Sequence, residues 1–545
     1  MTVNFGLSNF KPEPDQAPAV RINTLSPQQM AAVDWVTTGR GNCILEAVAG
    51  SGKTTTIIEM VKAAVKLQPR TFIDVAAYNK KIADEIAGKM IRAGLPTTVK
   101  VGTFHSFGWG AWRKAAPDCK LEGLDVTGRY PQAGYFKFRR IAGDMDLDPI
   151  YHSFVKALVS LAKQRCIGVV VPISKDDAWW DIVDHFDLEG HLADEDGRLR
   201  SNHEELLKTG VTLAQEVLQR GNAIAREVVD FDDQIYLPLM AHCRVWQNDW
   251  LFVDEAQDIN PARRFLAKKM LKPGGRAVFV GDRHQAIYGF TGADSDSLDI
   301  IRHEFNAKDI PLTVSWRCPK LVVEHAQAFV SHIRAAETAI DGVVKLQVRR
   351  TEFMQTEFQP TDAILCRKNA PLIGLAYSLI RRGVPCHVEG REIGRGIIEL
   401  ASKWKVNRMD VLVNKLKEYK IRQIARLMAK GRELEADQIT DKVDTLLAFI
   451  EGMPPASTVA DLKKRVESMF ADTADGTPAL TLTLSSIHKS KGREWPRVFL
   501  YGRNLWMPSK FARQDWQMQQ ETNLHYVAIT RAMDTFVDVE VQKED

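Results

Sequence analysis

The segment from Ile44 to Ile57 constrains the fold most, because a short apolar run there changes into a glycine-rich turn and then into a helical pattern. Gly50 to Thr54 fit the end of the phosphate-binding motif G-x-x-x-x-G-K-[ST], although Ala47 stands where the motif begins with glycine. In such a loop, backbone N–H groups face the phosphates, the lysine bridges the outer phosphates and the hydroxyl ligates Mg²⁺. The expected nucleotide-binding residues of the loop are Ala49, Gly50, Ser51, Gly52, Lys53, Thr54 and Thr55.

A pair of acids at the end of the apolar run WLFVDEA complements this loop. Taken alone, the loop also fits a glycine-rich turn with an exposed lysine, and it does not separate a kinase from a transporter ATPase or a helicase. Nucleotide hydrolysis requires one carboxylate that holds Mg²⁺ and one that polarises the attacking water. We expect Asp254, together with Thr54, to hold the metal and Glu255 to act on the water. The two features together predict a nucleoside triphosphatase.

Short apolar runs alternate with helical patterns along much of the chain, as in CILEA before TTIIEMVKAAVKL and TFIDVAAY before NKKIADEIAGKMIRAG. This alternation predicts parallel sheets covered by helices, with ligands at the carboxyl ends of the strands. Two long, mainly helical stretches interrupt it, so we expect two α/β cores, each with a helical insertion. The expected parts are a tail at 1–20, a first core at 21–105 and 248–300 with an insertion at 106–247, and a second core at 301–390 and 479–545 with an insertion at 391–478.

Composition and charge limit the class of protein. No apolar run reaches the roughly 20 residues that span a bilayer, and the first residues lack the pattern of a signal peptide, so a cytoplasmic protein without membrane contact is expected. Seven scattered cysteines without C-x-x-C spacing predict reduced thiols and no zinc site. The net charge of +4 is unevenly spread: residues 403–432 hold ten Lys or Arg and two acids, whereas residues 176–196 hold nine acids and no base.

Nine sequence blocks follow one another across residues 25–532: LSPQQMAAV, EAVAGSGKTTT, AAYNKKIADEI, GTFHSFG, FVDEAQD, FVGDRHQAIYGFTGAD, LTVSWRCP, SSIHKSKGREWPRVFL and NLHYVAITRA. In this order they resemble the UvrD/Rep-type superfamily 1 DNA helicases, where alanine also occurs at the place of Ala47. The form DEAQD favours this family over the RNA helicases. The resemblance implies two RecA-like parallel-sheet cores of the P-loop NTPase class, each with a mainly helical insertion, and ATP with Mg²⁺ bound between them.

By this resemblance, the nucleoside part of ATP is held by residues outside the phosphate loop. Gln29 is expected to read the adenine edge, Trp316 to stack on the adenine ring and Glu494 to bond the ribose. An aromatic side chain at position 316 suits the flat surface of a purine.

The resemblance also implies residues that act on the γ-phosphate. Gln285 is expected to contact the γ-phosphate or the attacking water and to report its presence to the DNA site. Arg317 and Arg531, from the second core, are expected to stabilise the transition-state charge as arginine fingers. The alternative for each arginine is a surface salt bridge. With the fingers in these roles, hydrolysis requires the two cores to close.

The family binds single-stranded DNA with stacking aromatic residues and phosphate contacts. Phe290 takes the place of a base-stacking residue, but Thr291 follows it where the family usually has arginine, which removes one expected charged contact. For Tyr78 and Phe104 the alternative is a core aromatic at a strand end. The expected DNA-binding residues are Tyr78, Asn79, Thr103, Phe104, His105, Phe290, Arg367, Asn369 and His488.

These features lead to one expected function and two alternatives. We expect an ATP-dependent helicase that moves on single-stranded DNA, 3′ to 5′ by the resemblance, and acts at single/double-strand junctions. The alternatives are a translocase that strips proteins from DNA or serves a nuclease, and a non-catalytic binding module, which the intact ATP-site residues disfavour. The protein is expected to be a monomer, bacterial or phage-encoded and nucleoid-associated, with a repair or replication partner. The basic stretch in the second insertion fits either a solvated helix face or a phosphate contact, and the acidic stretch is expected to face away from DNA.

Overall fold

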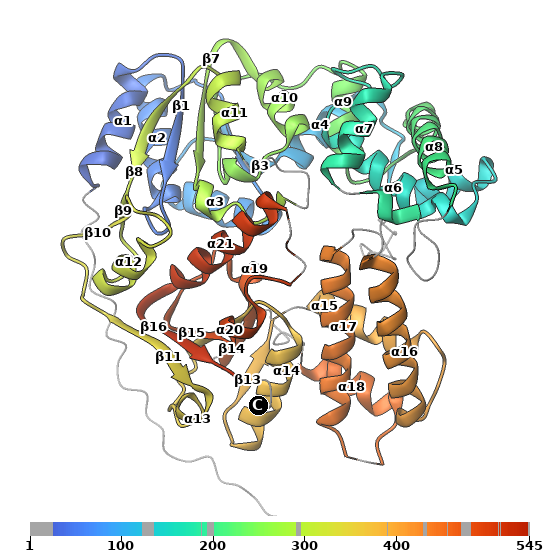
Figure 1. Cartoon of the computed structure of the whole chain (residues 1–545). Coiled ribbons are helices and arrows are strands. Elements are labelled where there is room, and N and C mark those ends of the chain that lie inside the picture. Colours follow the sequence, from blue (N-terminus) through green and yellow to red (C-terminus); the bar gives the residue numbers. More distant parts are fainter. Residues whose placement is uncertain are drawn as a thin grey trace, which may run out of the picture.

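The computed structural model describes residues 25–122, 136–186, 188–192, 201–289, 296–389, 391–428, 433–454, 456–469, 481–510, 512 and 514–542. Within these ranges, no helix is both long enough and apolar enough to cross a bilayer. Two six-stranded parallel sheets organise the described residues. Figure 1 shows the first sheet above the second, with one helical unit beside each of them.

The first sheet has the strand order β3-β2-β6-β7-β1-β8, and its neighbouring strands pair in parallel. Because side chains alternate between the faces of a strand, Leu45 and Ile44 of β1 enter two different cores. Helices α1, α2 and α3 cover the face of Leu45, whereas α4, α10 and α11 cover the face of Ile44. The elements are β1 (Asn42–Ala47), β2 (Ile73–Ala77), β3 (Val99–Thr103), β6 (Asn248–Val253), β7 (Leu271–Gly281), β8 (Ala307–Leu312), α1 (Pro27–Thr38), α2 (Lys53–Leu67), α3 (Lys80–Arg92), η2 (Ala256–Asp258), α10 (Pro261–Lys269), η3 (Arg283–Gln285) and α11 (Ser297–Glu304).

Strand β8 corrects one expected boundary. We expected the second core to begin at residue 301, but β8 pairs in parallel with β1 and forms the edge of the first sheet. The sequence hides this strand, because Lys308, Asp309 and Pro311 interrupt its apolar residues. Charged residues and proline are tolerated on an edge strand, which has only one neighbour.

The second sheet has the order β11-β16-β15-β12-β14-β13, and it is also parallel. One of its faces packs on α14 and on the helices of the second insertion, and the other packs on α12 and α21. Its elements, with the short segments beside it, are β9 (Val314–Ser315), α12 (Lys320–Ala326), β10 (Arg334–Ala335), β11 (Val343–Arg349), α13 (Arg350–Phe353), β12 (Ala363–Cys366), α14 (Ala370–Arg381), β13 (Cys386–Val388), β14 (Leu482–Ser486), α19 (Ile487–Ser490), β15 (Trp495–Tyr501), α20 (Arg503–Trp506), α21 (Asp515–Ile529) and β16 (Ala532–Glu540).

The residues between β3 and β6 form a helical unit with its own apolar core, built around Phe154 and Trp179. A buried ion cluster supports this unit, since Lys163 lies 2.5 Å from Asp230 and 2.7 Å from Asp233. The elements are α4 (Phe104–Ala115), β4 (Lys120–Leu121), α5 (Phe136–Asp144), α6 (Pro149–Gln164), α7 (Asp176–His185), η1 (Leu188–Leu192), α8 (His203–Ala223), β5 (Val228–Val229) and α9 (Asp233–Met240).

A second helical unit lies between β13 and β14, at the lower right of Figure 1. Most of its buried residues join those of α14 and the second sheet, and a small cluster of its own forms around Leu427 and Ala436. Phe449, for example, packs edge-on against Tyr377 of α14 at a ring-centroid distance of 5.8 Å. The elements are α15 (Arg391–Ser402), α16 (Met409–Met428), α17 (Glu433–Glu451) and α18 (Val459–Met469).

Candidate functional site

The glycine-rich loop between β1 and α2 lies at the boundary of the two cores. Gly50 and Gly52 have φ angles of 73° and 80°, which glycine adopts at little cost. A Cβ atom on Gly50 would lie 2.6 Å from Cβ of Arg317, so the second core reaches the loop. The Ser51 hydroxyl is buried and has no hydrogen-bond partner among the described residues. A loop that has glycine at two positions and a hydroxyl without a hydrogen-bond partner has room and a polar group for a phosphate.

Lys53 and Glu255 form an ion pair below this loop. The ammonium nitrogen of Lys53 lies 2.9 Å from Oε1 of Glu255, and Lys491 from the second core lies 3.9 Å from Oε2. Burial would raise the pKa of Glu255, but the charges of Lys53 and Lys491 outweigh it and lower the pKa to about 2. Burial and the charge of Glu255 raise the pKa of the neighbouring Asp254 to about 6. The two adjacent acids therefore have different electrostatic environments.

Thr54 and Asp254 are the residues that could hold Mg²⁺. The hydroxyl and the carboxylate are oxygen donors, which Mg²⁺ prefers, and Mg²⁺ usually takes one or two protein ligands with phosphates and water completing the shell. Among the described residues there is no group of three or more His, Cys, Asp or Glu that would form an all-protein metal site. This donor set fits a metal that arrives with a nucleotide.

A cavity of about 550 Å³ lies beside the loop and is lined by both cores. Gln29 and Trp316 both line it, and Trp316 is 39% exposed. Gln29 is held firmly, because its amide donates to the Thr56 hydroxyl at 3.1 Å and its oxygen accepts from the Ser26 N–H at 2.9 Å. The residues expected to contact adenine therefore share one cavity.

The two expected arginine fingers lie at the core boundary with different partners. Arg317 bonds Glu494, the residue expected at the ribose, at 2.5 Å. Arg531 is buried, and one guanidinium nitrogen lies 3.5 Å from Oε1 of Gln285. Burial and the nearby charge of Arg317 lower the pKa of Arg531 to about 10, so it stays a cation at neutral pH. Arg531 and Gln285 are thus brought together across the boundary.

Three second-core residues make further contacts that join the cores and were missed by the sequence reasoning, although all of the residues lie inside its motif blocks. The Ala49 N–H donates to the Tyr526 hydroxyl at 3.0 Å. Lys491 lies 2.5 Å from Asp258 and donates to the Gln285 carbonyl at 2.7 Å. Asn523 donates to the Ala286 carbonyl at 2.8 Å. The blocks SSIHKSKGREWPRVFL and NLHYVAITRA contain these second-core residues, but a sequence block does not reveal which first-core group each residue contacts.

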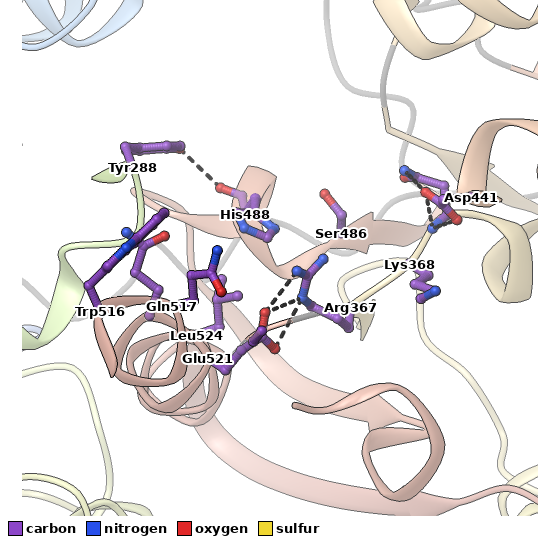
Figure 2. Close-up of a pocket in the computed structure, with 13 residues that line it drawn as sticks. Tyr288, Arg367, Lys368, Asp441, Ser486, His488, Trp516, Gln517, Glu521 and Leu524 are labelled. Carbon is purple, nitrogen blue, oxygen red and sulfur yellow. Dashed lines mark hydrogen bonds and ion pairs between the residues drawn. The ribbon is translucent and has the colours of Figure 1, made fainter. Parts of the chain in front are cut away.

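A second cavity, which we call the strand-facing cavity, lies where the expected DNA-binding residues of the second core meet. Figure 2 shows Arg367 joined to Glu521 and Tyr288 joined to His488. Arg367 makes bonds of 2.8–3.2 Å to both oxygens of Glu521, and the Tyr288 hydroxyl donates to the His488 carbonyl at 3.2 Å. Burial and Arg367 lower the pKa of His488 to about 3, so its imidazole is neutral. The cavity is lined by Tyr288, Arg367, Lys368, Asn369, Asp441, Ser486, His488, Ala512, Trp516, Gln517, Gln520, Glu521 and Leu524.

Two first-core candidates are aromatic residues in stacked pairs. Tyr78 stacks on Tyr288 with a centroid distance of 5.4 Å and an interplanar angle of 9°, which links it to the strand-facing cavity. His105 stacks on Phe231 at 3.9 Å, and Phe231 is 64% exposed. Burial and Arg263 lower the pKa of His105 to about 3. Tyr78, Tyr288 and His105 are half-buried, and of the four rings Phe231 is the exposed one.

The other first-core candidates are tied to helix ends or to the interior. Asn79 caps α3 by accepting from the Ile82 N–H, and Thr103 caps α4 by accepting from the Ser106 N–H. Phe104 is only 3% exposed and packs in the core of the first sheet, as its structural alternative anticipated. Phe290 lies outside the described residues.

Two parallel-sheet cores with a phosphate loop at their boundary define the P-loop NTPase fold with two RecA-like units. Residues 25–306 match the model of the UvrD/REP helicase N-terminal domain, and residues 391–537 match the UvrD-like helicase C-terminal domain. The chain belongs to the UvrD/Rep helicase family.

Curated relatives agree with this family at low identity. The chain is 26% identical over 325 residues to the ATP-dependent DNA helicase Rep of Escherichia coli K12, covering 56% of this chain and 43% of that protein. It is 22% identical over 635 residues to a probable DNA helicase II homolog of Mycoplasma genitalium, covering 93% and 83%. For the ATP-dependent DNA helicase PcrA of Staphylococcus epidermidis RP62A, identity is 23%, with 62% of each chain covered. The match spans less than half the length of Rep.

Proposed function

We propose that the protein is an ATP-dependent DNA helicase that moves along single-stranded DNA, 3′ to 5′, and separates strands at single/double-strand junctions. The observation that carries this proposal is the short path between the candidate ATP site and the strand-facing cavity. Gln285, at the candidate ATP site, lies three residues before Tyr288, which lines the strand-facing cavity. We place the protein in the cytoplasm of a bacterium or a phage-infected cell, where it would act as a monomer, near the nucleoid, with a repair or replication partner.

The chemistry at the ATP site starts from the Lys53–Glu255 ion pair. A bound γ-phosphate would attract the Lys53 ammonium, which frees the Glu255 carboxylate to polarise a water molecule. Glu255 suits this role because Lys491, which lies 3.9 Å from its Oε2, would stay beside the carboxylate after Lys53 has turned to the phosphate. Thr54 and Asp254 would hold Mg²⁺, which would neutralise phosphate charge when bound.

Arg317 and Arg531 would supply positive charge from the second core, so that hydrolysis requires a closed boundary. Arg317 is bonded to Glu494, and it would have to leave this partner to reach a phosphate. Arg531 needs a smaller change, because it already lies beside Gln285. The two arginines therefore have separable roles in the proposal.

Coupling to DNA would run through the segment that begins at Gln285. Its carbonyl binds Lys491 and the adjacent Ala286 carbonyl binds Asn523, both from the second core. Tyr288 then contacts His488 at the strand-facing cavity. A shift of this segment on hydrolysis would change both cavities together, and alternating grip on the strand would move the protein.

The test measures ATP hydrolysis with and without single-stranded DNA, and then unwinding of duplexes with a 3′ or a 5′ tail. We expect hydrolysis to be stimulated by DNA and unwinding to require the 3′ tail. Stimulated hydrolysis without unwinding would favour the translocase alternative. Hydrolysis indifferent to DNA would refute both, and unwinding only from a 5′ tail would overturn the polarity.

A further inference from the structure

The second helical insertion reaches the strand-facing cavity through one carboxylate. Asp441 of α17 accepts hydrogen bonds from the Asn369 N–H at 2.8 Å, the Ala370 N–H at 2.8 Å and the Asn369 side-chain amide at 2.7 Å. Asp441 and Asn369 both line the cavity, together with Arg367 and His488. Figure 2 shows Asp441 at the end of the cavity opposite Trp516. The insertion thus contributes directly to this cavity.

The bonds matter because the start of α14 has few other partners. The first N–H groups of a helix lack intrahelical acceptors. Asn369, at the capping position, makes no side-chain bond to the helix, and Pro371 has no N–H to offer. Asp441 supplies the missing acceptor from another helix, and its charge is favourable at a helix N-terminus. The turn between β12 and α14, which carries Arg367 and Asn369, is therefore held by α17 of the second insertion as well as by the Arg367–Glu521 ion pair within the second core.

We propose that Asp441 is a positioning residue for the strand-facing cavity, through which the second insertion holds the β12–α14 turn in the shape that grips single-stranded DNA. The inference rests on the proposed function, since it assigns a regulator to the same cavity. The insertion and the turn are coupled along α14 as well, because Phe449 of α17 packs on Tyr377 of α14. A displacement of α17 would therefore act on the turn directly.

The decisive variant is Asp441→Asn, compared with Glu451→Gln. Both remove one negative charge from α17, but Glu451 is exposed at the end of the helix. Loss of a negative charge favours binding of a polyanion by electrostatics alone. Positioning predicts the opposite sign, because an amide at 441 would place an N–H₂ group against the donors of the turn. We expect the Kd for an oligothymidylate to rise about tenfold in Asp441→Asn, the size of a lost charge-assisted hydrogen bond, and to stay unchanged in Glu451→Gln.

Two readouts separate positioning from general damage. The rate of ATP hydrolysis without DNA, and the maximal rate at saturating DNA, should match the unaltered protein, while the DNA concentration for half-maximal stimulation rises. In a double-mutant cycle with Asn369→Ala, the double variant should bind no more weakly than the weaker single variant, because both changes act on one turn.

The outcomes that overturn the inference are distinct from those that overturn the function. If the unaltered protein shows no DNA-stimulated hydrolysis, the proposed function fails and the inference falls with it. If stimulation is normal but Asp441→Asn binds DNA as tightly as the unaltered protein, or more tightly, the inference alone is wrong. Fully additive effects of Asp441→Asn and Asn369→Ala would also overturn it.

Discussion

The hydrogen bond between the Ala49 N–H and the Tyr526 hydroxyl offers the sharpest test of core closure. Tyr526→Phe removes only the hydroxyl oxygen, and the ring stays in a fully buried site, so no cavity of side-chain size forms. A buried N–H left without a partner costs about 1–3 kcal/mol. Ala49 belongs to the phosphate loop and Tyr526 to α21, so the cost falls on the contact between the cores rather than on either core.

Since about 1.4 kcal/mol is a factor of ten, the closed arrangement should lose about fivefold to over a hundredfold in population. We expect kcat for DNA-stimulated ATP hydrolysis to fall by at least about fivefold, while the thermal stability changes little. The assay is steady-state ATP hydrolysis at saturating DNA and MgATP, with nucleotide affinity measured separately by a fluorescent ATP analogue.

A matched control is Tyr236→Phe. Tyr236 is also buried, and its hydroxyl accepts a hydrogen bond from Asn222 at 3.2 Å, but both residues lie in the first insertion. Loss of the Tyr236 hydroxyl should leave kcat for DNA-stimulated ATP hydrolysis unchanged. Full activity in Tyr526→Phe, or an equal loss in both variants, would refute the view that this bond holds the cores together.

Three further outcomes are expected. Lys53→Ala should abolish hydrolysis, because it removes the proposed phosphate-binding cation, and normal turnover would refute the assigned site. Lys163→Met should lower the free energy of unfolding by about 3–5 kcal/mol, because it leaves the buried Asp233 carboxylate with less compensation; urea denaturation checks this against exposed Lys208→Met, which should cost nothing measurable. His488 has a pKa lowered to about 3 by burial, so it is neutral at neutral pH and charges only well below it. From about pH 5.5 to about pH 8, the Kd for DNA should therefore depend on pH in the same way in His488→Asn and in the unaltered protein. A titration step in this range that is present in the unaltered protein and absent in the variant would contradict the buried neutral state.

Much of the fold followed from the sequence, because parallel α/β units leave short-range patterns. The family and the two RecA-like cores are confirmed by the family matches and by the two parallel sheets. The sequence pattern does not predict strand β8, because this edge strand contains Lys308 and Pro311 and has no continuous apolar run. The roles of the individual site residues, and the division of the chain apart from this boundary, stay predictions.

By itself, the sequence determined the chemical groups of the phosphate loop and the acidic pair, since a few adjacent residues fix a turn, a helix start and a strand end. Only the tertiary structure decided which distant groups meet. Tyr526 reaches Ala49 from 477 positions away, and Asp441 caps a helix 71 positions earlier in the chain. Such pairs depend on strand order and helix packing. The sequence alone offers many donors and acceptors of the same type, and it does not identify which of them is the partner. The sequence alone shows Ala47 in the place of the first glycine of the motif. Only the tertiary structure shows that Arg317 of the second core lies against Gly50.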